Sequence, residues 1–161
     1  MMDPRASSML RGLLSQRPVA ALATLHRGEP AVSMAPFVLP QGEDEFLIHV
    51  SGLATHTRDM LEHPRVGLLV TAEADGSVPP QALPRISLQV DASPLPREGE
   101  RYAHARAHYL ARFPDAGITF ELADFSLFAL KPISARLVAG FGRAHALAGE
   151  ALLAWLRAPA P

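Results

Sequence analysis

Alternating and continuous runs of apolar residues divide the chain into short segments of strand character. The segment 85–91, Arg-Ile-Ser-Leu-Gln-Val-Asp, alternates polar and apolar positions, which is typical of a strand with one buried face. A turn containing Gly28 separates two further runs and indicates a hairpin. The pattern predicts six or seven strands, at residues 19–25, 30–39, 45–50, 66–71, 85–91, 125–130 and 133–139.

Helical spacing of apolar residues occurs in fewer places. An opening helix is predicted over residues 4–16, where Met9, Leu10, Leu13 and Leu14 share a face. Prolines mark the ends of helices, because proline lacks an N–H and restricts the residue before it. Further helices are predicted from near Thr55 to just before Pro64, over 97–113 and over 150–156, and the tail at 158–161 is expected to fray.

The order of these elements indicates the class of fold. A parallel, doubly wound sheet needs a helix between successive strands. Here the helices interrupt groups of strands instead. The sequence therefore predicts a mainly β (α+β) fold, a small and mostly antiparallel barrel with peripheral helices.

Composition narrows the classes of protein that fit this pattern. With 161 residues, 48% of them hydrophobic and 19% charged, the chain fits one globular domain. A net charge of −1 without a run of Lys or Arg excludes the electrostatic footprint of a nucleic-acid partner. The absence of cysteine excludes disulfides, thiolate chemistry and Cys-ligated metals.

The sequence also carries few signals of targeting. Its N-terminus lacks an apolar core of the signal-peptide type, and no apolar run approaches the ~20 residues of a membrane span. We therefore expect a cytoplasmic protein with no membrane partner.

Candidate chemistry concentrates where the strand at 45–50 passes into a helix. Ser51, Thr55 and Thr57 surround this junction, and Arg58 follows in the first turn of the helix. Free N–H groups at a helix N-terminus bind anions, and an Arg adds a planar donor fork suited to a phosphate. The alternative is that these hydroxyls are ordinary helix caps.

The histidines offer a second candidate chemistry. His104 and His108 lie four residues apart on one face of a predicted helix, which is the spacing of a metal-binding pair. No carboxylate on that face completes a site, so a solvated or partner-facing helix is expected and no metal. His145 follows the turn at 140–143 and is a weaker candidate for a cofactor groove.

Five motifs then occur in one order along most of the chain. They are Leu22-Ala-Thr-Leu…Gly28-Glu-Pro-Ala-Val-Ser33-Met-Ala-Pro36-Phe, Leu53-Ala-x-His-Thr57, Pro84-Arg-Ile-Ser-Leu88, Tyr109-Leu-x-Arg-x-Pro-Asp115 and Gly140-Phe-Gly-Arg-Ala144. Through them the chain resembles the FMN-binding split barrels, and more narrowly the branch related to pyridoxamine 5′-phosphate oxidase that includes haem-utilisation proteins.

The resemblance implies a particular architecture. It implies a six-stranded antiparallel Greek-key split barrel and a homodimer with FMN in a groove between the subunits. It divides the chain into an N-terminal helix at 1–17, an FMN-binding split-barrel domain at 18–145 and a C-terminal helix and frayed tail at 146–161. The apolar segments 66–70 and 127–130 are expected to be covered by the second subunit.

The resemblance also implies site residues. Ser51, Thr55, His56, Thr57 and Arg58 are expected around the FMN phosphate, with His56 as a phosphate donor or a cap rather than a catalytic acid. The same resemblance implies flavin and ribityl contacts at Ser33, Met34, Ala35 and Pro36, and a further grip on the flavin by Arg85, from its own or the partner subunit.

Two functions follow from the resemblance. The first is an FMN-dependent oxidoreductase acting on an unidentified small molecule. The alternative is a non-catalytic FMN- or haem-binding protein of haem utilisation. A true pyridoxamine-phosphate oxidase is disfavoured because it must hold a second phosphate, and the chain has one lysine, Lys131.

Overall fold

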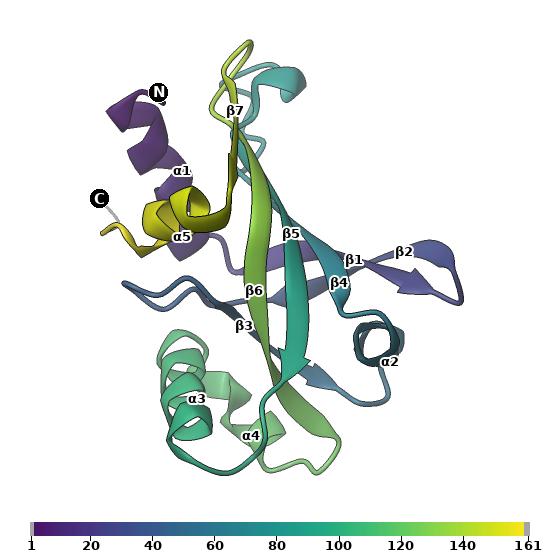
Figure 1. Cartoon of the computed structure of the whole chain (residues 1–161). Helices are drawn as coiled ribbons and strands as arrows, with labels where there is room; N and C mark the ends of the chain where they lie inside the picture. Colours follow the sequence, from purple (N-terminus) through teal and green to yellow (C-terminus); the bar gives the residue numbers. More distant parts are fainter. Residues whose placement is uncertain (1, 160–161) are drawn as a thin grey trace.

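One antiparallel sheet curls into a barrel in the computed structural model, which describes residues 2–159 (Figure 1). The strand order is β2-β1-β4-β5-β6-β3, and β7 pairs with β6 outside that path. The strands are β1 (Val19–His26), β2 (Glu29–Pro36), β3 (Phe46–Ser51), β4 (Arg65–Thr71), β5 (Arg85–Pro94), β6 (Phe125–Val138) and β7 (Ala144–Ala148). The predicted six-stranded antiparallel split barrel is confirmed, with one additional short strand.

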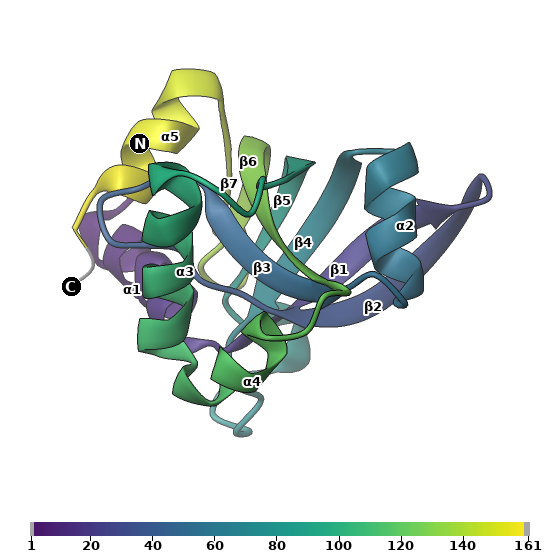
Figure 2. The ribbon, with the colours of Figure 1, turned by 90° about the horizontal axis from the view of Figure 1, so that it is seen from below.

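The helices lie at the periphery, as predicted (Figures 1 and 2). They are α1 (Pro4–Gln16), α2 (Thr55–Glu62), α3 (Glu100–Arg112), α4 (Gly117–Phe120) and α5 (Gly149–Arg157), with 3₁₀ turns η1 (Pro80–Ala82) and η2 (Pro114–Ala116). None of the helices in residues 2–159 is long and apolar enough to cross a membrane. Residues 160–161 of the tail that was expected to fray lie outside the described part of the chain.

The barrel closes through one short contact between β2 and β3, the strands at the two ends of the sheet order. Val38, just beyond β2, forms an isolated antiparallel bridge with Leu47 of β3. The Val38 N–H donates to the Leu47 carbonyl at 2.9 Å, and the Leu47 N–H donates to the Val38 carbonyl at 2.7 Å. The two edge strands of the sheet are thereby joined, which limits the unpaired edge that an open sheet would expose.

Two predicted strands, 125–130 and 133–139, form the single 14-residue strand β6. The prediction placed a break at Lys131-Pro132. In the structure Val90 pairs with Pro132 and Gln89 with Ser134, so that Ile133 is an extra residue in the ladder. A β-bulge tolerates the missing N–H of a proline, and the strand continues through it.

The strand β7 was not predicted. Its residues pair with Ser134–Val138 of β6, although Ala-His-Ala-Leu-Ala has little intrinsic strand preference. Pairing with an existing strand overrides that preference. The domain boundary expected between residues 145 and 146 falls inside this strand.

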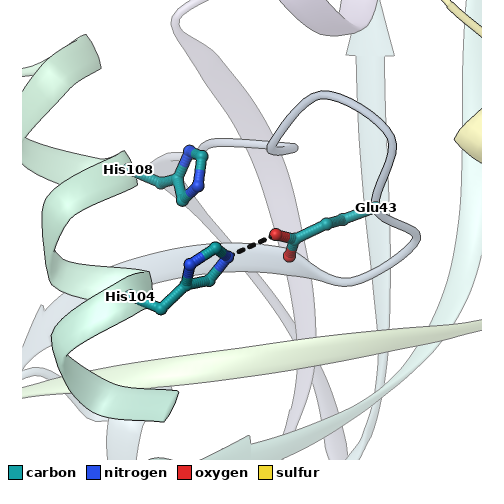
Figure 3. A group of neighbouring side chains, drawn as sticks. All are labelled: Glu43, His104 and His108. Atoms are coloured by element: carbon teal, nitrogen blue, oxygen red, sulfur yellow. Dashed lines mark hydrogen bonds and ion pairs between the residues drawn. The ribbon is translucent and has the colours of Figure 1, made fainter. Parts of the chain in front are cut away.

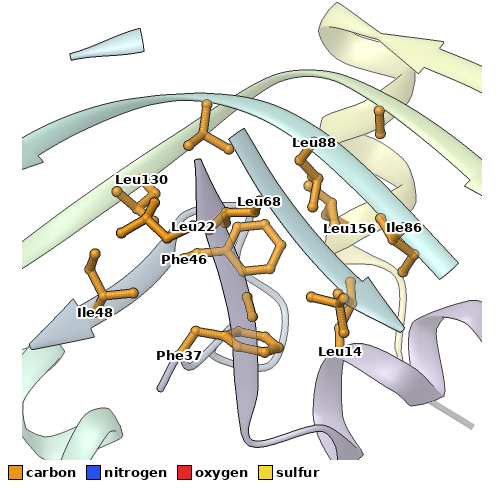
Figure 4. Packing of buried hydrophobic residues seen from close by; sticks show 14 of the residues in the cluster. Leu14, Leu22, Phe37, Phe46, Ile48, Leu68, Ile86, Leu88, Leu130 and Leu156 are labelled. Atoms are coloured by element: carbon orange, nitrogen blue, oxygen red, sulfur yellow. The ribbon is translucent and has the colours of Figure 1, made fainter. Parts of the chain in front are cut away.

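The main hydrophobic core fills the barrel and extends to three helices, with Met60 as the contribution of α2 (Figure 4). Leu22, Phe46, Ile86 and Leu137 are completely buried in its strands. The helices α1 and α5 pack against one end of the barrel and contribute Leu10, Leu13, Leu14, Leu152 and Leu156. Burying a leucine or phenylalanine side chain contributes about 1.5–3 kcal/mol each, so this cluster dominates the stability of the fold.

A second core lies between α3, α4 and the opposite face of β3 and β6. The ring of His49 is buried there and stacks on Phe120 with centroids 3.8 Å apart. Burial, together with the charge of Arg97, lowers the pKa of His49 to about 4, so the ring is neutral at pH 7. Thr119 provides its hydrogen-bond partner, 3.2 Å from Nδ1.

The two cores together explain why the segments 66–70 and 127–130 are so apolar. All residues at 127–130 are buried, and so are Val66, Leu68 and Val70. The expectation that a second subunit covers 66–70 and 127–130 was wrong for these side chains, because the chain buries them itself. Of the 66–70 segment, Leu69 and Gly67 face outward.

We expect Leu22→Ala to reduce the free energy of unfolding by about 2–5 kcal/mol, because it opens a cavity in a filled barrel. Ile118, which is 77% exposed on α4, provides the control, and Ile118→Ala is expected to change stability by no more than about 0.5 kcal/mol. Urea unfolding of both variants measures the difference. Equal effects would contradict the assignment of the barrel interior as the main core.

Candidate functional site

The four candidate residues on β2 do not face the same side of the strand. Ser33 and Ala35 point toward α2 and the core, whereas Met34 and Pro36 are exposed on the outside. Successive side chains of a strand alternate between its two faces, so this division is unavoidable. A single flat ligand in contact with β2 therefore meets either Ser33 and Ala35 or Met34 and Pro36.

The β3–α2 junction brings Ser51 and Thr57 together, with both hydroxyls engaged. The Ser51 hydroxyl donates to the Asp124 carboxylate at 2.6 Å and accepts from the Leu53 N–H at 3.1 Å. Thr57 is buried, and its hydroxyl donates to the Ser51 carbonyl at 2.7 Å. Both hydroxyls therefore stabilise the turn that precedes α2, and no side chain among residues 2–159 caps the N-terminus of the helix.

The other candidates at the junction are more exposed. Thr55 begins α2 on the surface, and the cap residue Ala54 has no side-chain bond to the helix within the described chain. Arg58 is also exposed, and its guanidinium makes one long contact of 3.4 Å to the Leu53 carbonyl. Arg58 is thus the one fixed cation among the predicted phosphate ligands, and the Asp124 carboxylate stands beside Ser51.

His56 bridges α2 to β2. Its Nδ1 lies 3.0 Å from the Ser33 hydroxyl. Burial lowers the pKa of His56, and the nearby Asp59 charge only partly opposes this shift. The imidazole is therefore neutral at pH 7, and it contributes a hydrogen bond rather than a positive charge for a phosphate.

A buried carboxylate missed in the sequence fixes the position of α2. Asp59 is 3% exposed, and its oxygens accept from the Thr24 hydroxyl at 2.8 Å and lie 2.8 Å from His26 Nδ1. Burial by itself would raise the pKa of Asp59, but the hydrogen bonds from His26 and Thr24 outweigh it and hold that pKa below its usual value. Asp59 shares the buried face of α2 with Thr57 and Met60. Its position on that face is the sequence feature that could have indicated a buried carboxylate.

The predicted site residue Arg85 lies far from this junction. It begins β5 and pairs with Thr71 at the end of β4, whereas α2 precedes Arg65 at the start of β4. The length of β4, about 20 Å, separates them. The guanidinium of Arg85 donates to the carbonyls of Gln81 and Leu83, at 3.2 and 2.9 Å. Within one chain, Arg85 and the end of α2 therefore lie at opposite ends of β4.

Instead, Arg85 borders a broad, uncovered face of the sheet. Cross-strand neighbours run from Met34 through Ala21 to Leu69, and from Val32 through Ala23 to Gly67. Val32 is 75% exposed and Met34 57%. We call this surface the outer face, and define it by Ala21, Ala23, Leu25, Val32, Met34, Gly67 and Leu69.

The outer face continues into two shallow hollows. One, of about 450 Å³, lies over β5, β6 and β7 and is lined by Ser87, Gln89, Ser134 and Arg136 among others. The second, of about 430 Å³, lies beside η1 and includes Thr71 and Arg85. Strand register connects the outer face to the first hollow, because Leu69 of the outer face pairs with Ser87, and Ser87 pairs with Arg136. Arg136 has no ion-pair partner among residues 2–159.

The fold and this surface together define a small split-barrel protein with an open, largely apolar sheet face. The family model described as pyridoxamine 5′-phosphate oxidase matches residues 7–139, and the chain therefore belongs to that family. This membership agrees with the resemblance found in the five sequence motifs.

The similar proteins place the chain in the haem-utilisation branch. It is 29% identical over 152 residues to the haem oxygenase HutZ of Vibrio cholerae, covering 92% of this chain and 85% of that protein. A haem-binding protein from Mycobacterium smegmatis superposes with a TM-score of 0.82 at 31% identity, over 96% of this chain and 62% of the other. The structure of HutZ, there called a haem storage protein, gives a TM-score of 0.70 at 28% identity, over 82% and 91%.

We expect Asp59→Asn to lower the melting temperature at pH 7, because the ionised carboxylate is stabilised by Thr24 and His26. A carboxyl whose pKa is depressed in the folded state contributes stability above its unfolded pKa of about 3.9 and loses it as the pH falls through the folded value. The difference between wild type and variant should therefore shrink below about pH 4.

Thermal unfolding of both proteins from pH 7 to about pH 3 measures this difference. Contributions of other groups that titrate over the same range, such as His49, are common to both proteins and cancel. A difference that stays constant down to the lowest pH would contradict a stabilising role for the ionised carboxylate.

Proposed function

We propose that this protein binds haem at the outer face as part of haem utilisation. The observation that carries the proposal is a solvent-exposed apolar sheet surface bordered by Arg85 and Arg136. Haem has a broad, flat, apolar ring and two carboxylates at one edge. An apolar face suits the ring, and arginine is the side chain best suited to bidentate contact with a carboxylate.

The similar proteins support haem over FMN as the ligand. HutZ is named as a haem oxygenase, and the M. smegmatis protein as a haem-binding protein. FMN stays a prediction of the family resemblance. Its phosphate carries about two negative charges, and the β3–α2 junction offers it one exposed arginine, a neutral His56 and a neighbouring Asp124 carboxylate.

A homodimer is the second part of the proposal. Monomeric proteins rarely leave a large contiguous apolar surface exposed, and here helices cover other parts of the barrel but not the outer face. A second copy packed about a two-fold axis would cover this surface in both subunits, with the haem held between them. It would also be the means of bringing an Arg85 to the β3–α2 junction, which β4 separates from the Arg85 of its own chain.

We expect tag-free protein to bind haem with a saturable Soret change, and Arg85→Ala and Arg136→Ala each to weaken binding about tenfold, or about 1.4 kcal/mol. Arg5→Ala, an exposed arginine on α1, is the matched control and should bind as wild type does. Haem affinity unchanged in both test variants would show that the outer face is not the site. Tighter binding of FMN than of haem would overturn the choice of ligand.

The proposed dimer makes a separate prediction. Sedimentation at micromolar concentration should show a dimer, and Val32→Asp should shift it toward monomer by placing a charge in the buried interface. Ile118→Asp places the same charge on an exposed residue of α4 and should leave the dimer intact. A wild-type monomer that still binds haem would remove the second copy from the proposal.

A further inference from the structure

Two histidines and a glutamate from distant parts of the chain meet beside α3 (Figure 3). His104 and His108 come from α3, and Glu43 comes from the loop between β2 and β3. One potential ligand atom from each residue lies within 4.8 Å of the other two. The distance from His104 Nε2 to Glu43 Oε1 is 2.5 Å, and the two imidazole rings are 4.4 Å apart between centroids.

The helix α3 holds the two histidines side by side. Residues four apart share a helix face, so His104 and His108 form one pair, and Ala105 and Tyr109 form another. Ala105 and Tyr109 are buried in the second core, which fixes the rotation of the helix about its axis. The histidine pair is one position earlier and therefore faces the β2–β3 loop.

The loop between β2 and β3 is also fixed in position around Glu43. A turn places Gly42 at φ +79°, a conformation that favours glycine, and the Glu43 N–H donates to the Pro40 carbonyl at 3.1 Å. The next two residues pair with other elements: Asp44 with Arg157 of α5 at 2.6 Å, and Glu45 with Arg101 of α3 at 2.8 Å. The turn before Glu43 and the two ion pairs after it therefore hold the backbone of Glu43 in place.

We propose that Glu43, His104 and His108 form a binding site for a divalent transition metal ion. Two imidazole nitrogens and one carboxylate oxygen suit Zn²⁺, Cu²⁺ or Ni²⁺, whereas Mg²⁺ and Ca²⁺ prefer oxygen ligands throughout. Three protein ligands leave at least one position open for water. The expectation of no metal rested on the lack of a carboxylate on the helix face, and the fold supplies one from 61 residues away.

The geometry needs little adjustment to accept such an ion. Zn–N and Zn–O bonds of about 2.0–2.2 Å place tetrahedral ligand atoms about 3.4 Å apart. The Glu43–His104 distance lies below that value, and the 4.8 Å limit for the whole group lies above it. Small torsions of side chains that are at least partly exposed connect the two arrangements.

A simple ion pair explains less of the cluster. Glu43 and His104 could form one by themselves. His108 makes no hydrogen bond within residues 2–159, and its ring packs against the His104 ring in a T-shaped arrangement. A metal ion gives both imidazoles and the carboxylate one shared partner.

This site is separate from the proposed haem surface. In both views α3 lies on the opposite side of the barrel from α2 and from the hairpin of β1 and β2 that carries Val32 and Met34 (Figures 1 and 2). The proposal of a metal site can therefore be confirmed or overturned independently of the proposal of a haem site.

Calorimetric titration of tag-free, chelator-stripped protein with ZnCl₂ tests the proposal. We expect one Zn²⁺ per chain and no saturable binding of MgCl₂. His108→Ala and Glu43→Gln should each weaken Zn²⁺ binding at least tenfold. Glu43→Gln keeps the size of the side chain and removes its charge, and His63→Ala, an exposed histidine at the end of α2, is the control that should bind normally.

Two further readouts separate metal binding from a structural role. Because His108 lacks a hydrogen bond among the described residues, His108→Ala should melt at the wild-type temperature in EDTA and lose the rise that Zn²⁺ gives the wild type. Co²⁺ should develop visible ligand-field absorption with the wild type but not with His108→Ala. Normal Zn²⁺ binding by both test variants, or no stoichiometric binding by the wild type, would overturn the proposal.

The haem titration keeps the two sites distinguishable. His108→Ala is expected to bind haem as the wild type does, while Arg136→Ala is expected to bind Zn²⁺ normally. Loss of haem binding in His108→Ala would show that these histidines serve haem instead of a separate metal ion, and would also overturn the proposal.

Discussion

The burial of β6 on both of its faces at residues 127–130 is the constraint on which the rest of the fold depends. One face of this strand contributes Phe128, Leu130 and Leu137 to the barrel core, and the other contributes Leu127 and Ala129 to the core beneath α3 and α4. It pairs with β5, β3 and β7 along its length. A strand buried on both faces must have apolar layers on both sides, so the helices that cover it are as necessary as the barrel.

This demand leaves the helices unevenly distributed. The helices α3 and α4 cover the β3–β6 side, α1 and α5 pack against one end of the barrel, and α2 is held against β1 by Asp59. The outer face over β2, β1 and β4 receives none of them in the described chain. The exposure of Val32 and Met34 is therefore a consequence of how the rest of the molecule is covered, and the proposals of a haem site and of a second copy rest on it.

Polar groups inside this structure stabilise the arrangement as long as each has a partner. The carboxylate of Asp59 ties α2 to β1, and the neutral ring of His49 fits among aromatic side chains because Thr119 bonds to it. The same rule makes the β3–α2 junction a less suitable place for a dianion. The hydroxyls of Ser51 and Thr57 already serve a carboxylate and the backbone, so a phosphate would have to displace those bonds as well as be desolvated.

Local patterns in the sequence determined the elements of this protein. The alternation at 85–91, the proline after α2 and the helical spacing at 4–16 depend on near neighbours, and the predicted strands and helices there agree with the structure. The order of those elements excluded a doubly wound sheet and indicated an antiparallel barrel. The junction at Ser51–Arg58 was also local, and its residues do lie together.

Tertiary structure alone decided which distant residues meet. Alternation along β2 separated Met34 from Ser33, the length of β4 separated Arg85 from α2, and packing of the β2–β3 loop beside α3 brought Glu43 to His104. It also joined two apparent strands through the bulge at Ile133 and formed β7 from an alanine-rich segment. The physical reason is that periodicity records whether a side chain is buried, whereas its partners depend on contacts between segments that the chain brings together only when the whole core forms.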